Sequence, residues 1–404
     1  MASATSRRID SAFVDRLPVV DLVRLASVLA VCCYHLALSG VVLSPPGPWT
    51  RKVAEALAIN GLHGVTLFFV ISGFVITRTI RRRARESGRI DLWGFYARRC
   101  ARILPLLAVY VAVGIIATWV AGPAAKGPVA LLHPAGSRFD APFWVSLATF
   151  SFNWLVVVRE GVAVVPLYWG LLWSLAVEEQ FYLLYPPIMI ALGTTRRLGM
   201  LLVLVVLCGP LARAFCSLRW PALLDVRMNS FCQFDLIAVG CLLALVLEGR
   251  IQVAESVVRR AVEALAGLSG LAIVVATYVY SSQARLLDRV LAPTLFGVGL
   301  SAFLFAGIRA GWCSSRPVAA IAGVGRVTYG AYLFHVGVIA LLWWGLVGKD
   351  VLVAMAVVGG ATIATASLLH RYIELPADRR IRAFLLEGGI RRGTSGDAAL
   401  RAPP

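Results

Sequence analysis

The chain has 404 residues, of which 59% are hydrophobic and 15% are charged, and its mean hydropathy is +0.80. These values exclude an ordinary soluble globular domain and indicate an integral membrane protein. The formal net charge of +18 could suggest a nucleic-acid partner. The basic residues, however, gather in short clusters between apolar runs, as they do in the cytoplasmic loops of membrane proteins. We therefore expect a lipid bilayer as the partner, and no nucleic acid.

Apolar runs long enough to cross a bilayer recur along the chain. They predict an all-α polytopic bundle of about ten transmembrane helices, expected at 18–43, 62–80, 103–121, 168–192, 198–216, 231–248, 262–280, 291–309, 322–346 and 350–370. With both termini in the cytoplasm, this topology places most lysine and arginine residues inside. We expect a cytoplasmic tail at 1–16, a transmembrane domain at 17–372 and a disordered basic tail at 373–404.

The segment 142–158 is a further candidate for a membrane span, because it is apolar. A crossing there would move five arginines to the outside, against the distribution of the other basic residues, namely Arg196, Arg197, Arg250, Arg259 and Arg260. We therefore interpret it as a re-entrant or interfacial piece of a long external segment at about 122–167. A full eleventh span is the alternative.

Residue usage also bears on the source and on metals. Only Lys52, Lys126 and Lys349 among the 39 basic residues are lysine, which suggests high-GC coding. We expect a multi-pass protein of the plasma membrane of a high-GC bacterium. The eight cysteines show neither CxxC pairing nor zinc spacing, so we expect no metal site.

The first apolar run carries two polar groups that are costly in lipid, Arg24 and His35. At ~100° per residue they face the same way within about 20°, and they lie roughly 16 Å apart along the helix axis. One interpretation is a functional stripe with Arg24 at the cytoplasmic end and His35 deeper. The other is an arginine anchored at the headgroups and a histidine bonded to a neighbouring helix.

Two adjacent carboxylates, Glu178 and Glu179, lie inside another apolar run, in WSLAVEEQFYLLY. Ionisable groups in a span are functional candidates that face a polar cavity or a partner charge. A purely structural pairing with an arginine is the alternative. A third pair of polar groups, Arg326 and His335, lies further along the chain in GRVTYGAYLFHVGV.

Arg99 and Arg102 are three residues apart and therefore share one helix face at the start of the third predicted span. Two guanidinium groups suit phosphate recognition, because their planar forks bind phosphate oxygens in a bidentate manner. Anchoring at the cytoplasmic surface is the alternative. A proton-coupled transporter, or an enzyme that binds a phosphate-bearing donor and uses His35 as a base, would both fit these groups.

Several motifs, in order, resemble those of the membrane acyltransferase-3 family. They cover about 17–380 and comprise DLVRLASVLAVCCYHL, HGVTLFFVISGFVIT, FYARRCARILPL, LWSLAVEEQFYLLYP, FDLIAVGCLLAL, VGRVTYGAYLFHVGV and YIELPADR. Members carry acyl groups from acyl-CoA to hydroxyls of glycans, peptidoglycan, glycolipids or natural products such as macrolides. The resemblance implies that this chain does the same.

The resemblance also implies roles for the candidate residues. His35 matches the family's catalytic histidine, and Arg24 matches the arginine of the same motif. Arg99 and Arg102 match the pair that engages the donor's phosphates, Glu178 and Glu179 match the carboxylates of the VEEQFY motif, and Arg326 and His335 match a late, supporting motif. We expect Arg24 to help bind the donor and the two glutamates to act with His35 in catalysis. Thr66 stands where the family often has an acidic residue, which weakens any role for a carboxylate there.

We therefore predict an O-acyltransferase that moves an acyl group, an acetyl group being favoured, from acyl-CoA to a hydroxyl of a carbohydrate-containing acceptor. His35 either deprotonates the acceptor or takes the acyl group itself. The alternative function is a transporter or exporter that uses the same polar cavity. Inverted repeats with matching broken helices would support transport, and the sequence shows none.

Overall fold

The computed structural model describes residues 17–41, 43, 51–121, 127–131, 138–159, 166–219, 227–248, 257–280, 285–312 and 315–387. The regular structure of these residues is helical, with no β-strand among them. This confirms the predicted all-α fold class.

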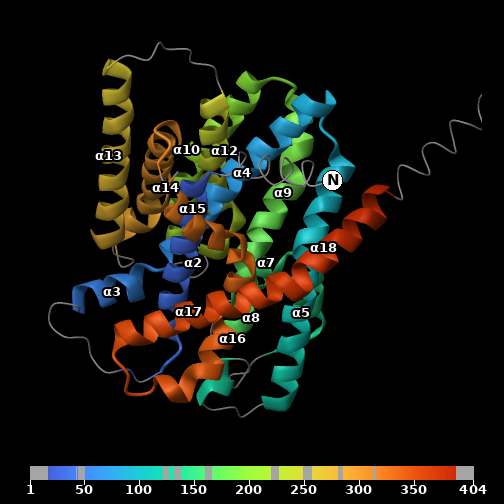
Figure 1. Ribbon diagram of the computed structural model, residues 1–404, viewed down its shortest axis with the longest axis vertical. Helices are drawn as coiled ribbons and strands as arrows, with labels where there is room; N and C mark the ends of the chain where they lie inside the picture. The colour runs from blue at the N-terminus through green and yellow to red at the C-terminus, as the bar shows by residue number, and fades with distance from the viewer. Residues whose placement is uncertain are drawn as a thin grey trace, which may run out of the picture.

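The helices form one bundle in which most of the long members run along its vertical axis (Figure 1). In chain order they are α2 (Pro18–Leu38), α3 (Arg51–Asn60), α4 (His63–Ser87), α5 (Leu92–Ala121), α6 (Ala141–Ala148), α7 (Phe152–Val158), α8 (Leu167–Gly170), α9 (Leu172–Leu192), α10 (Thr195–Arg219), α12 (Phe234–Glu248), α13 (Val257–Tyr280), α14 (Leu286–Arg309), α15 (Arg316–Ala322), α16 (Thr328–Leu346), α17 (Val351–Leu369) and α18 (Leu375–Arg382).

Eight of the ten predicted spans correspond to helices that are long and apolar enough to cross a membrane. The other two predicted spans are helices that lack the length or the apolar composition of a membrane span. The α9 helix carries two adjacent carboxylates and two prolines, and α12 has only 15 residues. Both lie inside the bundle: Val177 of α9 and Ile237 of α12 are fully buried. Surrounding helices bury α12 continuously from Asp235 to Cys241, whereas α9 also exposes apolar residues such as Leu183 and Leu184.

The helices α4 and α12 cross in close contact in the interior. An ideal Cβ at Gly73 would lie 1.9 Å from the carbonyl oxygen of Ile237, and one at Gly240 would lie 1.8 Å from that of Val70. Glycines at such crossings let two backbones approach, as in other membrane bundles. At the predicted cytoplasmic end of these helices, Arg81 and Arg85 of α4 pair with Glu248 of α12.

The segment 142–158 does not form one helix. Residues Ala141–Ala148 and Phe152–Val158 are two helices of eight and seven residues, separated at Phe150, whose φ is +52°. Neither is long enough to span a bilayer. The segment is therefore not an eleventh span, and its second helix, α7, packs against α9.

The C-terminal region differs from the prediction. The prediction of a disordered tail from residue 373 is wrong for residues up to 387. There α17 continues through a π-helical turn at His370–Glu374 into α18. This long tilted segment crosses the bundle and packs against α5 (Figure 1). The predicted tail at 1–16 and residues 388–404 lie outside the described residues.

Candidate active site

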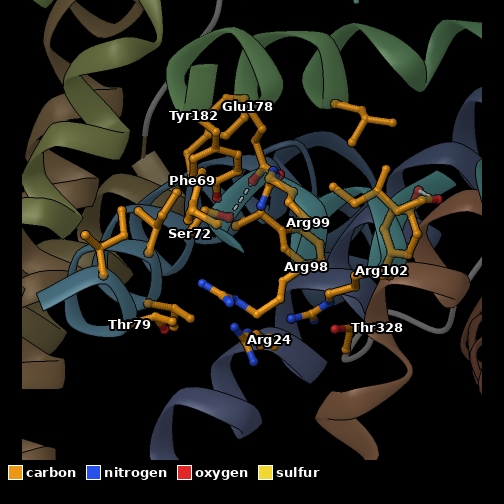
Figure 2. A pocket seen from close by; sticks show the side chains of 18 of the residues that line it. Arg24, Phe69, Ser72, Thr79, Arg98, Arg99, Arg102, Glu178, Tyr182 and Thr328 are labelled. Atoms are coloured by element: carbon orange, nitrogen blue, oxygen red, sulfur yellow. Dashed lines mark hydrogen bonds between the residues drawn. The ribbon is translucent and has the colours of Figure 1, made fainter. Parts of the chain in front are cut away.

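A cavity of about 360 Å³ opens among α2, α4, α5, α9 and α16. Its lining includes four of the predicted site residues, Arg24, Arg99, Arg102 and Glu178. Figure 2 shows Arg24 and Arg102 on one side of the open space, with Ser72 and Glu178 opposite them. Residues far apart in the sequence therefore meet at one site of a size typical for small ligands.

The two adjacent carboxylates have different surroundings. Glu178 lines the cavity, and the Ser72 hydroxyl donates to its Oε1 at 2.5 Å. Glu179 instead accepts from Nε of Arg99, at 3.0 Å and 2.9 Å to its two oxygens. The Arg99 guanidinium also lies over the Tyr182 ring, 3.4 Å from its centroid. Glu178 is thus the carboxylate that faces the cavity, and Glu179 neutralises Arg99.

This pairing separates the two arginines of the Arg99–Arg102 motif. Arg99 donates to Glu179 through Nε and one terminal nitrogen, so this carboxylate balances its charge. For Arg102, the described residues provide no ion pair. Arg24 pairs with Asp21 of the preceding helical turn at 3.1 Å. Of the three predicted donor-binding arginines, Arg102 is therefore the one whose charge is most available to an anionic ligand.

A second hollow of about 720 Å³ adjoins this cavity and shares Arg24, Arg102 and Arg382 with it. Further arginines from α4 and from the turn before α16 line it, namely Arg78, Arg82 and Arg326. The carboxylates of Glu374 and Asp378 are also present. Arg326 therefore lies at this basic mouth, on the side that loop charge predicts to be cytoplasmic.

His35 and His335 form a direct pair between α2 and α16. Nε2 of His335 lies 2.9 Å from Nδ1 of His35, and Nδ1 of His335 lies 2.6 Å from the carbonyl oxygen of Tyr332. A carbonyl only accepts, so Nδ1 of His335 carries a proton and its Nε2 accepts. Nδ1 of His35 then donates, to His335 and to the Val31 carbonyl at 3.1 Å. This network leaves the lone pair of His35 on Nε2.

The imidazole pair does not line the cavity. Tyr332 lies between the cavity and the histidine pair. Its side chain lines the cavity, and its ring centroid is 5.9 Å from that of His335. Its hydroxyl donates to the Leu171 carbonyl at 3.1 Å and contacts the Ser174 hydroxyl at 2.6 Å. In this conformation the cavity ends at Tyr332, and His35 lies behind it.

Sequence reasoning missed several of these groups. Ser72, Tyr182 and Tyr332 carry no charge, so nothing in an apolar run marks them. Arg213 and Asp235 could have been found, because each is a charged residue inside a predicted span, as Arg24 is. They form a fully buried bidentate pair, with distances of 3.0 Å and 2.9 Å.

Comparison with known proteins agrees with the motifs. The family model described as an acyltransferase domain matches residues 17–371. The peptidoglycan O-acetyltransferase OatA of Listeria monocytogenes is 26% identical over 376 residues, which are 89% of this chain and 55% of the relative. The O-acetyltransferase OatA of Staphylococcus aureus is 24% identical over 412 residues, 94% of this chain and 60% of the relative.

The putative peptidoglycan O-acetyltransferase YrhL of Bacillus subtilis is 30% identical over 198 residues, 48% of this chain and 27% of the relative. The chain thus spans at most three fifths of the length of these curated relatives. No solved structure matches it. Since the family model covers nearly the whole bundle, the chain belongs to the membrane acyltransferase-3 family.

Proposed function

We propose that the protein is an O-acyltransferase of a bacterial plasma membrane that moves an acetyl group from acetyl-CoA to a hydroxyl of a carbohydrate-containing acceptor. The observation that carries this proposal is the meeting of Arg24, Arg99, Arg102 and Glu178 in one cavity next to a histidine pair. The relatives support the acetyl group and the glycan: the Listeria monocytogenes protein is a peptidoglycan O-acetyltransferase, and the Staphylococcus aureus protein is an O-acetyltransferase.

The charge of the two hollows supports coenzyme A as the donor. Its pyrophosphate and 3′-phosphate need several cations, and the shared mouth offers Arg24, Arg102 and Arg382. The inner part of the cavity has apolar walls, including Phe68 and Phe69, which suit the pantetheine arm. The thioester would then point toward Tyr332 and the histidine pair.

His35 would act through Nε2, whose lone pair the contact with His335 leaves available. In direct transfer, Nε2 takes the proton of the acceptor hydroxyl as its oxygen bonds to the thioester carbon. The carbon–sulfur bond breaks, and the departing thiolate takes the proton from His35. In double displacement, Nε2 first bonds to the acyl carbon as CoA departs as its thiolate. The hydroxyl then attacks this acyl-imidazolium, the bond from Nε2 to carbon breaks, and Nε2 takes the hydroxyl proton and passes it to the thiolate or to solvent. Either route requires Tyr332 or the His35 ring to rotate.

The test is acetyl-CoA binding to the detergent-purified protein, measured by calorimetry. We expect Arg102→Ala to weaken binding at least about tenfold, because a charge-assisted hydrogen bond to phosphate is lost. Arg197→Ala is the matched control, since Arg197 is exposed on α10 and lines neither hollow. Equal affinity of wild type and Arg102→Ala, or no binding at all, would remove the support for an acyl-CoA donor and favour transport.

A further inference from the structure

A third cavity lies at the opposite end of the bundle from the basic mouth. It is lined by His63 at the start of α4, by Arg289 in the first turn of α14 and by Arg227 before α12. The predicted topology places these three helix ends outside the membrane. We call this cavity, with Arg227, Arg289, His63 and Gln233 in its wall, the external arginine pocket.

Three arginines line this pocket, but only one of them is matched by a carboxylate. Arg213 pairs with Asp235 at 2.9 Å. Among the described residues, no carboxylate forms an ion pair with Arg227 or Arg289. The Nε atom of Arg289 is buried and has no hydrogen-bond partner there. Burying such a donor is costly unless something accepts from it.

The surroundings of Arg227 show the same excess of positive charge. Burial lowers the pKa of its guanidinium, contact with the Tyr34 hydroxyl opposes this effect, and the charge of Arg289 lowers the pKa further. Two guanidinium groups that repel each other in one small pocket are stabilised by an anion placed between them.

The size of the pocket limits the anion. Its volume is about 40 Å³, room for roughly three water molecules. A carboxylate or phosphate group fits, whereas a sugar ring does not. The pocket can therefore anchor one anionic group of a larger molecule that extends over the external surface.

The pocket also lies close to the histidine pair. Arg227 contacts Tyr34, which is adjacent to His35 in α2. Val65 lines both this pocket and the large cavity, so one side chain separates the two spaces at this point. A molecule anchored by its anionic group would bring neighbouring hydroxyls to the external side of His35.

We propose that the external arginine pocket binds a carboxylate or phosphate of the acceptor, so that the acceptor is an anionic glycan approached from outside. This inference rests on the proposed acyltransferase function and specifies its substrate class. Arg227 and Arg289 are the residues that select the anionic acceptor.

The test uses two sugars that differ in one group, methyl β-glucuronide, which carries a carboxylate, and the neutral methyl β-glucoside. Binding to the full-length protein is measured by calorimetry in detergent. We expect wild type to bind the glucuronide at least about tenfold more tightly, because the carboxylate makes charge-assisted hydrogen bonds. Arg289→Gln and Arg227→Gln should abolish this preference, and Arg289→Lys should reduce it.

Arg285→Gln is the matched control. Arg285 is exposed one turn before Arg289 and does not line the pocket, so this variant should keep the wild-type preference. Equal binding of both sugars by wild type would overturn the proposal. So would a loss of the glucuronide preference in Arg285→Gln as large as that in Arg289→Gln. Thermal unfolding of each variant verifies that it is folded.

A second measurement separates the acceptor from a lipid headgroup as the source of the anion. The protein is reconstituted in phosphatidylcholine vesicles, and transfer of radiolabelled acetyl from acetyl-CoA to each sugar is followed. Faster transfer to the glucuronide, dependent on Arg289, supports the proposal. If phosphatidylglycerol instead stabilises the protein through Arg289 and transfer shows no preference, the pocket is a lipid site and the proposal is wrong. If neither sugar is acetylated, the proposed function fails on these acceptors, while the binding ratio still decides the pocket.

Discussion

Two arginine–carboxylate pairs inside the bundle have nearly the same chemistry and very different surroundings. The Arg213–Asp235 pair joins α10 to α12, and its side chains are 1% and 0% exposed. The Arg99–Glu179 pair joins α5 to α9 at the wall of the large cavity, where the side chains are 21% and 14% exposed. We call the first the sealed pair, because neither side chain is exposed to solvent, although Arg213 also lines the small external arginine pocket. The second borders the large cavity, a space that a ligand can enter.

This difference shows why an intramembrane charge is not by itself a catalytic residue. Arg213 also donates to the carbonyl oxygens of Val290 and Cys232 and to Thr294, so its donors are used up within the fold. The Arg99–Glu179 pair orders one wall of the cavity and leaves Arg102 and Glu178 facing it. We infer that the sealed pair holds helices together and that the cavity pair positions ligand-binding groups.

The largest expected effect is on the sealed pair. Asp235→Asn leaves the Arg213 charge buried without a counter-charge, which costs about 3–5 kcal/mol in comparable pairs. We expect a sharp fall in the yield of folded protein and in its thermal unfolding midpoint. The double variant Arg213→Met, Asp235→Leu should be more stable than Asp235→Asn. If the single variant unfolds at the wild-type temperature, the pair does not hold α10 to α12.

The packing around the sealed pair predicts a smaller effect. An ideal Cβ at Gly209 would lie 2.3 Å from Cγ of Asp235, whereas one at Gly199 of the same helix meets nothing within 4 Å. Gly209→Ala should cost about 1–3 kcal/mol by overpacking. Gly199→Ala should be neutral or stabilising, since alanine favours a helix by about 1 kcal/mol. Similar unfolding midpoints for the two variants would show that α10 moves freely away from Asp235.

The stability of the protein should be less sensitive to loss of one partner of the Arg99–Glu179 pair than to loss of one partner of the Arg213–Asp235 pair. Arg99→Ala leaves Glu179 uncompensated, but water in the cavity reduces the cost to about 1–2 kcal/mol. Adding Glu179→Gln to Arg99→Ala should restore most of that loss, as a double-mutant cycle of unfolding midpoints would show. A stability loss as large as that of Asp235→Asn would contradict the distinction between the two pairs.

An exposed pair in the external segment gives the smallest effect. Two hydrogen bonds from Arg159, at 2.6 Å each, hold the pKa of the Asp140 carboxyl below its ordinary value of 3.8. A carboxyl whose pKa is lowered in the folded state stabilises the fold at pH values above its ordinary pKa. This stabilisation is lost as the pH falls through the lowered pKa. The difference between wild-type and Asp140→Asn unfolding midpoints should therefore be small at about pH 6 and shrink as pH falls below 3.8. A difference that grows on acidification would contradict this sign.

The sequence predicts the helical class and eight of the spans because apolar length is a local property. It also counts α9 and α12 among the spans, and these two helices fall short of the length or composition of a span while they bury Val177 and Ile237 fully in the bundle. It also misses the helical continuation at α18, where an arginine-rich segment packs against α5.

For the site too, local patterns in the sequence predict some features, whereas others depend on how the helices pack. Charged residues in apolar runs point to Arg24, Arg102 and Glu178, and all three line the cavity. Whether Glu178 or Glu179 faces the cavity depends on which one Arg99 reaches, and that requires the relative rotation of α5 and α9. The contact of His35 with His335, 300 residues away, is equally invisible to local patterns.

The most direct test of the account is acetyl transfer by the purified protein in vesicles, with radiolabelled acetyl-CoA as donor and methyl β-glucuronide as acceptor. We predict transfer by wild type, none by His35→Ala and a reduced rate for His335→Gln, with acetyl-CoA affinity unchanged in both variants. Transfer at the wild-type rate by His35→Ala would contradict the assignment of His35 as the group that handles the proton or the acyl group.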